Sequence, residues 1–397
     1  MSLTDFRPEF DNAYQEIFQK TLVAKEIMNT RFEPTLRFGE SVERVSYDIS
    51  NVQVRDVTRG SASTIDTITD SSELLTVNLE KEAVFHISDG EVTQAGLLNP
   101  GEVIGGKIAH KVSQDLDYRC FSEVANAANT FDTGDLTTLS SSGVPITPSS
   151  TTIPQMTTRM AAKLRYAENQ EVSTNMAFVV DSYLASDVEQ YLMGKDIDIA
   201  GSVFKNGYAG VVRNAVMYVS ENLQGQVDQV VDVATADETI TINGVTFTAK
   251  ATPSAAGEFD IAGSVDAQGA ILVNAINGSA TGQDSATGYF EVSDAHRATL
   301  TNANVVASYD SGTSTLTITG AGRIIYSTTL SGAVVKFLHC YFGKKGAIDL
   351  VVQDMKDVDM RPTDDRRGTN VFSSYLAGIK TFTDGSKKFL DVQIVVA

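Results

Sequence analysis

The spacing of hydrophobic positions changes several times along the chain, and each change predicts a new element. Between residues 6 and 28 apolar side chains recur every three or four positions, which predicts an amphipathic helix. Residues 41–58 and 73–88 alternate with a period of two, and the polar stretch between them has loop composition. We predict one long β-ribbon, which must pack on a neighbour because a lone two-stranded ribbon is marginally stable in water.

Helical spacing returns after the ribbon. The longest such pattern covers residues 100–129 and opens at Pro100, and it corresponds to a helix on the order of 40 Å long. A Ser/Thr/Gly/Pro-rich connection, 131–154, separates it from a second helix. A strand at 175–180 and a helix at about 182–193 follow. The next apolar strand is predicted in FKNGYAGVVRNAVMYVSENL, after a glycine turn.

The composition changes abruptly between Gln226 and Ser331. Alternating strands are predicted to form two hairpins there, with a short helix at 266–277 between them. The turns of these hairpins contain Asn243, Gly244, Asp310 and Gly312. Three basic side chains stand against eleven acidic ones, so the segment carries about eight of the net negative charges. We predict a self-contained acidic α+β module, after which the earlier pattern resumes from Val334.

Length and charge narrow the possible functions. A chain of 397 residues with 42% hydrophobic residues should form two or three globular domains. The net charge of -19 argues against a sequence-independent nucleic-acid binder, which needs surplus Lys and Arg. Cys120 and Cys340 are expected to be reduced, buried thiols. We see no signal pattern and no apolar stretch of membrane-spanning length, so we expect a protein retained in a reducing compartment with no membrane partner.

Candidate chemistry is sparse. The four histidines lie in four different segments, and the Gly-Lys pairs in GGKIAHK and GKK lack the rest of a phosphate loop. The glycine turn at Gly207 and Gly210 has no Lys-Ser/Thr after it either. Two acidic groups could in principle hold a cation, but solvated acidic loops are favoured; they are Asp196 with Asp198, and Asp354 with Asp357 and Asp359. We therefore predict no catalytic, cofactor-binding or metal-binding residues, and keep an enzyme only as a residual alternative.

The order of elements resembles the major capsid proteins of tailed bacteriophages with the Hong Kong 97 fold. MSLTDFRPEF is similar to the N-terminal arm of the branch that lacks a cleaved scaffold, and RFGESVERVSYDISNVQVRDV and VNLEKEAVFHISDGEV resemble the strands of its extended loop. The helix that opens at Pro100 resembles the spine helix. AFVVDSYLASDVEQYLM, GAIDLVVQDMKDVDM and KKFLDVQIVVA resemble parts of the axial domain.

The resemblance implies an α+β chain divided into five parts. They are an arm at 1–35, an extended loop at 36–92, a peripheral domain with the spine helix at 93–150, an axial domain at 151–225 and 332–397, and an inserted acidic α+β domain at 226–331.

The implied function is structural. Pentamers and hexamers of the chain would form the icosahedral head shell of the virion around double-stranded DNA, without sequence-specific binding and after assembly in the host cytoplasm. A scaffolding protein, a portal and a decoration protein are the implied partners. Candidate contacts between subunits are Val45, Tyr47, Ile49, Leu75, Val77, Leu79, Phe6, Phe10 and Tyr14. The alternative is a carbohydrate- or receptor-binding surface protein anchored by the residues outside the insertion.

Overall fold

The computed structural model divides the chain into two compact units. It describes residues 23–32, 40–48, 52–56, 59, 65–88, 100–168, 175–193, 211–212, 215–362 and 368–396. Unit 1 comprises Met1–Leu116 and Lys345–Lys388, and unit 2 comprises Asp117–Lys344 and Phe389–Ala397. The chain passes from unit 1 to unit 2 within the helix α4, Pro100–Ser122.

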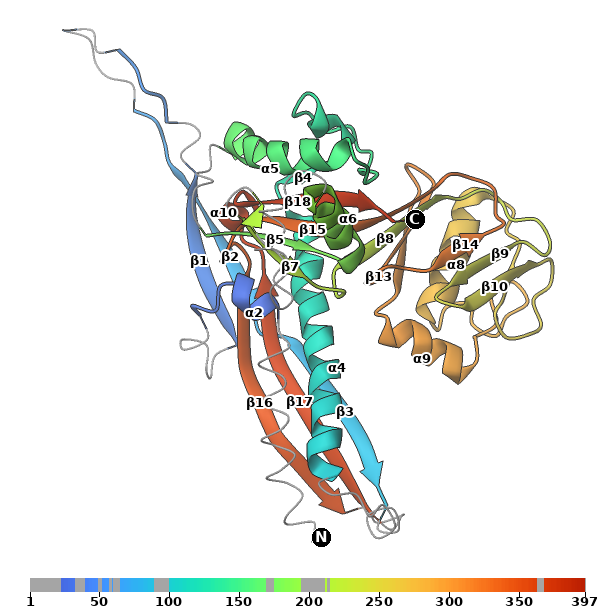
Figure 1. The fold of residues 1–397 in the computed structure, drawn as a ribbon. Coiled ribbons are helices and arrows are strands. Elements are labelled where there is room, and N and C mark those ends of the chain that lie inside the picture. The colour runs from blue at the N-terminus through green and yellow to red at the C-terminus, as the bar shows by residue number, and fades with distance from the viewer. Residues whose placement is uncertain are drawn as a thin grey trace. The chain divides into compact units, whose positions relative to one another are not determined.

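The main sheet of unit 1 has three antiparallel strands in the order β16-β17-β3. Their bounds are Asp349–Pro362 for β16, Thr369–Lys380 for β17 and Leu79–Ile87 for β3. α4 runs alongside this sheet (Figure 1), and the Tyr375 hydroxyl donates a hydrogen bond of 2.6 Å to the Asp115 carboxylate on α4. Residues 345–388 therefore pack with the ribbon segment and α4. Residues 332–344 and 389–397 group with 151–225 in unit 2.

The predicted ribbon is shorter than expected. β1, Ser41–Asp48, pairs antiparallel with β2, Thr69–Thr76, so that Ser41 lies opposite Thr76. The returning strand does not continue to residue 88 in the ribbon, because the chain leaves β1 after Thr76. The next strand, β3, pairs over nine residues with β17 instead.

A close backbone crossing accompanies this change of partner. A Cβ added at Gly378 of β17 would lie 2.7 Å from the Thr76 carbonyl oxygen and 3.1 Å from the Val77 Cα. The Val77 N–H donates to the Glu40 carbonyl oxygen at 2.9 Å. Glycine at 378 thus lets the chain pass over β17 between β2 and β3.

A small apolar cluster lies under the base of the ribbon. Leu75, Val351 and Phe382 form it, and Phe32, Val42 and Val77 pack against it. Two four-residue helices also belong to unit 1, α2 at Ala24–Ile27 and α10 at Thr383–Ser386.

Unit 2 is built on a nine-stranded sheet in the order β12-β13-β8-β15-β5-β7-β6, with β18 paired to β15 and to β4. The strands are β4 Asn129–Phe131, β5 Met176–Val180, β6 Val211–Val212, β7 Ala215–Val219, β8 Gln224–Val230, β12 Val306–Asp310, β13 Thr315–Ala321, β15 Val334–Lys344 and β18 Phe389–Val395. Every side chain of β5 is buried. Hydrophobic runs of this kind are typical of strands covered on both faces.

The helices of unit 2 test two predictions. α6, Ser182–Met193, has the predicted bounds, and α5, Thr152–Glu168, covers the predicted second helix. The long helix ends at Ser122, earlier than predicted, and a 3₁₀ turn, η1, follows at Glu123–Asn126. The chain cannot stay helical to 129 because β4 pairs in parallel with β18. A second 3₁₀ turn, η2, lies at Thr133–Leu136.

The segment 226–331 adds a second sheet and two helices. The sheet has the order β11-β10-β9-β14, and α8 and α9 lie beside its strands in Figure 1. The bounds are β9 Thr239–Ile242, β10 Val245–Lys250, β11 Glu258–Asp260, β14 Tyr326–Thr328, α8 Val265–Asn277 and α9 Asp294–Asn302. One apolar cluster, whose buried members all fall between Val227 and Leu330, joins these elements.

Both predicted hairpins are present. Ile242 pairs with Val245 across a turn in which Asn243 has φ 49° and Gly244 φ 84°. Positive φ at both central residues is what a type I′ hairpin requires. In the second hairpin Asp310 pairs with Thr315. The α+β fold class is confirmed by the presence of helices and antiparallel sheets in both units.

The segment is nevertheless not self-contained. β8 pairs with β13 on one edge and with β15 on the other, so one sheet runs from the segment into the rest of unit 2. The Val230 N–H donates to the Ala333 carbonyl oxygen at 2.9 Å, which brings the two ends of residues 231–332 together. The segment therefore extends a hairpin formed by β8 and β15.

Candidate assembly surface

The two faces of the β1–β2 ribbon differ in burial. On one face Val42 lies opposite Leu75, which is fully buried in the cluster of unit 1. On the other face Glu43 lies opposite Leu74, and the next side chain on this face is Val45. Leu74 is 50% exposed and Val45 48% exposed. The ribbon thus keeps one apolar face for its own unit and leaves apolar side chains on the other.

The exposed apolar character increases toward the tip of the ribbon. Val52 and Ile68 are about half exposed, while Ile65 is 89% exposed and Val54 fully so. Such side chains in one projecting segment are typical of a protein interaction site, since scattered single ones need no explanation.

A polar contact joins the two segments of the tip. The Arg55 guanidinium donates to both carboxylate oxygens of Asp66, at 2.8 and 2.7 Å, and the Gln53 N–H donates to the same carboxylate at 2.9 Å. Arg55 and the Gln53 N–H lower the pKa of Asp66. Residues 52–56 and 65–68 are therefore held side by side.

The nine predicted contact residues have different surroundings. Val45 is exposed, Val77 and Leu79 are half-buried, and Leu75 is buried in its own unit. Tyr47 lies in β1 opposite Asp70. Its side chain, together with Ile49, Phe6, Phe10 and Tyr14, lies outside the described residues.

The predicted contacts leave out five other exposed apolar residues of the ribbon. Val52, Val54, Ile65 and Ile68 lie at the ribbon tip, and Leu74 lies on the outer face of β2. The signal was present: the isoleucines at 65 and 68 are the only large apolar residues in the polar stretch RGSASTIDTITDSS.

A charged cluster fixes the base of the ribbon. Arg44 of β1 forms an ion pair with Asp384, lies 3.9 Å from Asp349 and packs 5.1 Å from the centre of the Phe382 ring. The Asn29 side-chain amide donates to Asp349 as well. Burial raises the pKa of Asp349 to about 6, against the opposing effects of Asn29 and Arg44.

A second ion pair links segment 226–331 to the start of α6. The Arg323 guanidinium donates to Asp181 at 2.6 Å and lies 4.0 Å from the centre of the Tyr183 ring. The other oxygen of the buried Asp181 carboxylate accepts the Leu184 N–H at 3.1 Å, which caps α6.

Arg323 differs from the other two cations of the segment. Lys250 pairs with Asp237 and Arg297 pairs with Glu291, both inside the segment. Arg323 alone among the three pairs with a carboxylate outside it.

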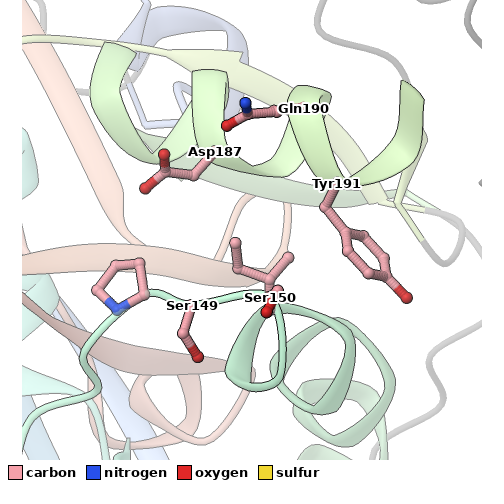
Figure 2. A pocket seen from close by; sticks show the side chains of 7 residues that line it. Ser149, Ser150, Asp187, Gln190 and Tyr191 are labelled. Carbon is pink, nitrogen blue, oxygen red and sulfur yellow. The ribbon is translucent and has the colours of Figure 1, made fainter. Parts of the chain in front are cut away.

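A hollow of about 350 Å³ lies between α6 and the loop before α5. Figure 2 shows Asp187, Gln190 and Tyr191 on α6 above that loop. The complete lining is Pro148, Ser149, Ser150, Ile153, Asp187, Gln190 and Tyr191. The Ser149 hydroxyl accepts the Thr152 N–H at 3.1 Å and so serves as a cap of α5. The lining contains no histidine or cysteine.

The cysteines and histidines considered as candidates for chemistry form no common site among the described residues. Cys120 and Cys340 are free and buried, as predicted, and burial raises the pKa of both thiols. His339 is buried between Asp391, at 2.8 Å, and Gln226, at 3.0 Å. The part of the chain that the structure describes holds no group of three or more potential metal ligands.

Of the remaining predicted positions, Asp310 and Gly312 lie in a hairpin turn. Asp310 accepts the Gly312 N–H at 2.9 Å in the second hairpin turn. Asp196, Asp198, Gly207 and Gly210 lie outside the described residues, as do the side chains of Asp354, Asp357 and Asp359. None of the described helices is both long and apolar enough to cross a membrane.

Comparisons with known proteins show which solved structures have a similar fold. No family model matches the chain, and no curated protein matches it. A chain from Mycobacterium phage Ogopogo aligns with 94% of this chain and 92% of its own length, at a TM-score of 0.50 and 10% identity. The protein shares its fold with a phage chain. The predicted resemblance to phage proteins is thus confirmed at the level of the fold.

Two further solved structures match with lower scores. A chain from Mycobacterium phage Che8 aligns with 94% of this chain and 90% of its own, at a TM-score of 0.48 and 11% identity. The asymmetric unit of the bacteriophage PhiM1 mature capsid aligns over 90% and 82%, at a TM-score of 0.43 and 10% identity.

Proposed function

We propose that this chain is a major capsid protein whose copies assemble as pentamers and hexamers into the icosahedral head shell of a tailed phage. The observation that carries the proposal is the ribbon, which leaves Val45, Leu74 and four apolar tip residues exposed. The element order seen in the sequence and the fold shared with a phage chain support it.

Each proposed ribbon contact contributes little binding free energy, but many copies of it add up in a shell. Burying one such side chain against another copy contributes roughly 1.5 to 3 kcal/mol. Each copy both gives and receives such contacts in a closed symmetric assembly, so the gain recurs around the shell. The proposed contact residues are therefore Val45 and Leu74 with the tip residues Val52, Val54, Ile65 and Ile68.

The proposed partners follow from the shell. The shell encloses double-stranded DNA without reading its sequence, consistent with a net charge of -19 that provides no surplus of cations for phosphates. A separate scaffolding protein selects the curvature, and a portal and a decoration protein complete the virion. Assembly takes place in the host cytoplasm. The chain has a structural role and no enzymatic one, and residues 226–331 form an inserted module of the axial domain.

The test is a pair of ribbon-tip variants, Val54→Asp and Ile65→Asp, compared with Ile325→Asp. Ile325 is also an exposed aliphatic residue, 72% accessible, but lies in segment 226–331. The tip variants should remain folded by circular dichroism and lose capsomers and shells in size-exclusion chromatography and negative-stain microscopy, because a charge at the contact stays hydrated. The control should assemble like the wild type.

Three outcomes would contradict the proposal. The wild type could stay monomeric with and without its scaffold, the tip variants could assemble normally, or Ile325→Asp could impair assembly as much as they do. The last result would move the contact from the ribbon to the module.

A further inference from the structure

β12 occupies one end of the nine-stranded sheet of unit 2, with β13 as its neighbour. The outer edge of a terminal strand presents backbone N–H and C=O groups to which a strand of another chain can add. β12 has the sequence VASYD, and Val306 is 53% exposed. This strand therefore has both the backbone groups and the side chains for pairing with another molecule.

The side chain of Asn277 occupies that edge. Its amide nitrogen donates to the Ala307 carbonyl oxygen at 2.8 Å, and its amide oxygen accepts the Ala307 N–H at 2.8 Å. These two hydrogen bonds reproduce the pair that one residue of an added antiparallel strand would form. The Val305 N–H, two residues earlier on the same edge, donates to the Leu300 carbonyl oxygen at 3.0 Å.

α8 is positioned so that Asn277 reaches the strand. The Tyr309 hydroxyl donates to Asp266 near the start of α8 at 3.0 Å. A Cβ added at Gly269 would lie 2.4 Å from the Tyr309 ring, so only glycine allows the helix and this ring to approach so closely. Asn277 is the last residue of α8, and Gly278 ends the helix with φ 65°.

We infer that Asn277 guards β12 against strand addition by a second copy of this chain. The strand that would add is β12 of the second copy, in an antiparallel and symmetric β12–β12 pair. The two β12 edges are identical, so replacing Asn277 frees the edge of both copies at once. The inference concerns the unassembled protein and does not require the proposed shell.

The experiment compares three full-length variants. Asn277→Ala opens the edge. Asn277→Asp also loses the donor to Ala307 but puts a charge on the edge, which opposes pairing. Asn274→Ala, one turn earlier in α8, is the matched control. Hydrogen exchange of residues 305–310 is measured in unassembled protein at a low and a high concentration, with light scattering for the mass.

We expect the Ala307 amide of Asn277→Ala to exchange about five times faster than in the wild type when dilute, because one hydrogen bond is lost. Protection should return at high concentration as dimers form. Asn277→Asp keeps an oxygen that accepts the Ala307 N–H, so this amide should stay protected at both concentrations and no dimer should form. Asn274→Ala should match the wild type.

Two results would overturn the inference. One is unchanged exchange and mass in Asn277→Ala at both concentrations. The other is a loss of protection that no increase in concentration restores, or one that spreads evenly over residues 227–330, since either would make Asn277 a structural residue only.

Discussion

Asp349 is buried beside groups of both signs. Arg44 and Lys388 favour its carboxylate, Asp384 disfavours it, and burial outweighs them to raise its pKa to about 6. Asp384 behaves in the opposite way: burial acts to raise its pKa, but Lys388 and Arg44 hold it below the usual range. Asp384 therefore keeps Arg44 paired at pH values where Asp349 has taken up a proton.

This arrangement gives a pH dependence with a definite sign. The folded state holds a proton on Asp349 up to about pH 6, while the unfolded chain releases it near pH 3.8. The stability contributed by Asp349 is therefore full below pH 3.8 and is lost as the pH rises to about 6. Relative to Asp349→Asn, the wild type should gain stability when the pH falls from 7.5 to 5.

Urea unfolding of both proteins at pH 7.5 and pH 5 measures this difference. The comparison cancels other titrating groups, which the variant retains. An unchanged or opposite difference between the two pH values would show that Arg44 and Asn29, and not burial, dominate at this carboxyl group.

Single residues also show which features could be predicted from the sequence. Asn243-Gly244 was predicted because the turn needs two residues that tolerate positive φ, which is a local requirement. The burial of Leu75 was not predicted, because it depends on Phe382, more than 300 positions later. The exposed tip isoleucines could have been found, since their apolar side chains break a polar stretch.

At the scale of elements, local patterns were predictable and partners were not. α6 was placed at its observed bounds because its apolar spacing and its flanking strands are local. The returning strand of the ribbon was predicted too long because Leu75, Val77 and Leu79 alternate without interruption. In the structure β2 ends at Thr76, and the following strand, β3, pairs with β17. Between the two strands the chain passes close to Gly378, which is distant in sequence.

Gly378→Ala tests that crossing. Its Cβ would meet backbone atoms of Thr76 and Val77, which cannot move aside like a flexible side chain. We expect a loss of about 1 to 3 kcal/mol in the free energy of unfolding, measured by urea denaturation.

Gly263→Ala is the control for this variant. An added Cβ there would meet nothing within 4 Å, so its effect should stay within about 0.5 kcal/mol. If Gly378→Ala were equally neutral, the change of strand partner after Thr76 would not depend on the close crossing.

At the scale of the whole molecule, several contacts join segment 226–331 to the rest of unit 2. β8 pairs with β15, Val230 bonds to Ala333, and Arg323 neutralises the buried Asp181. The composition shift predicted where the segment begins and ends. It could not predict the shared sheet, because pairing between β8 and β15 is a contact across about a hundred residues.

Excision of the segment is predicted to leave assembly intact. Replacing residues 231–332 by Asn-Gly should close β8 and β15 as a two-residue hairpin. Asp181→Asn must accompany the deletion, because an unpaired buried carboxylate would cost about 3 to 5 kcal/mol. The variant should melt at a lower temperature, since β8 loses β13, and still form shells by negative-stain microscopy.

The alternative function predicts a different result. If the segment were a receptor- or carbohydrate-binding part on an anchor, shells would be absent from the wild type as well as from the deletion. Shells in the wild type and none in the deletion would make the segment part of the contact between subunits.

The passage of the chain from β2 over Gly378 into β3 also sets how the ribbon carries mechanical load. A pull on the ribbon tip is transmitted along β2 and through residues 76–78 into β3. β3 then lies along the force, and its nine residue pairs with β17 lie across it. Their hydrogen bonds are loaded in shear, so they must break together and cannot open one after another from an end. The ribbon is therefore anchored by a strand loaded in shear, and the strands of unit 1 bear the tension in it.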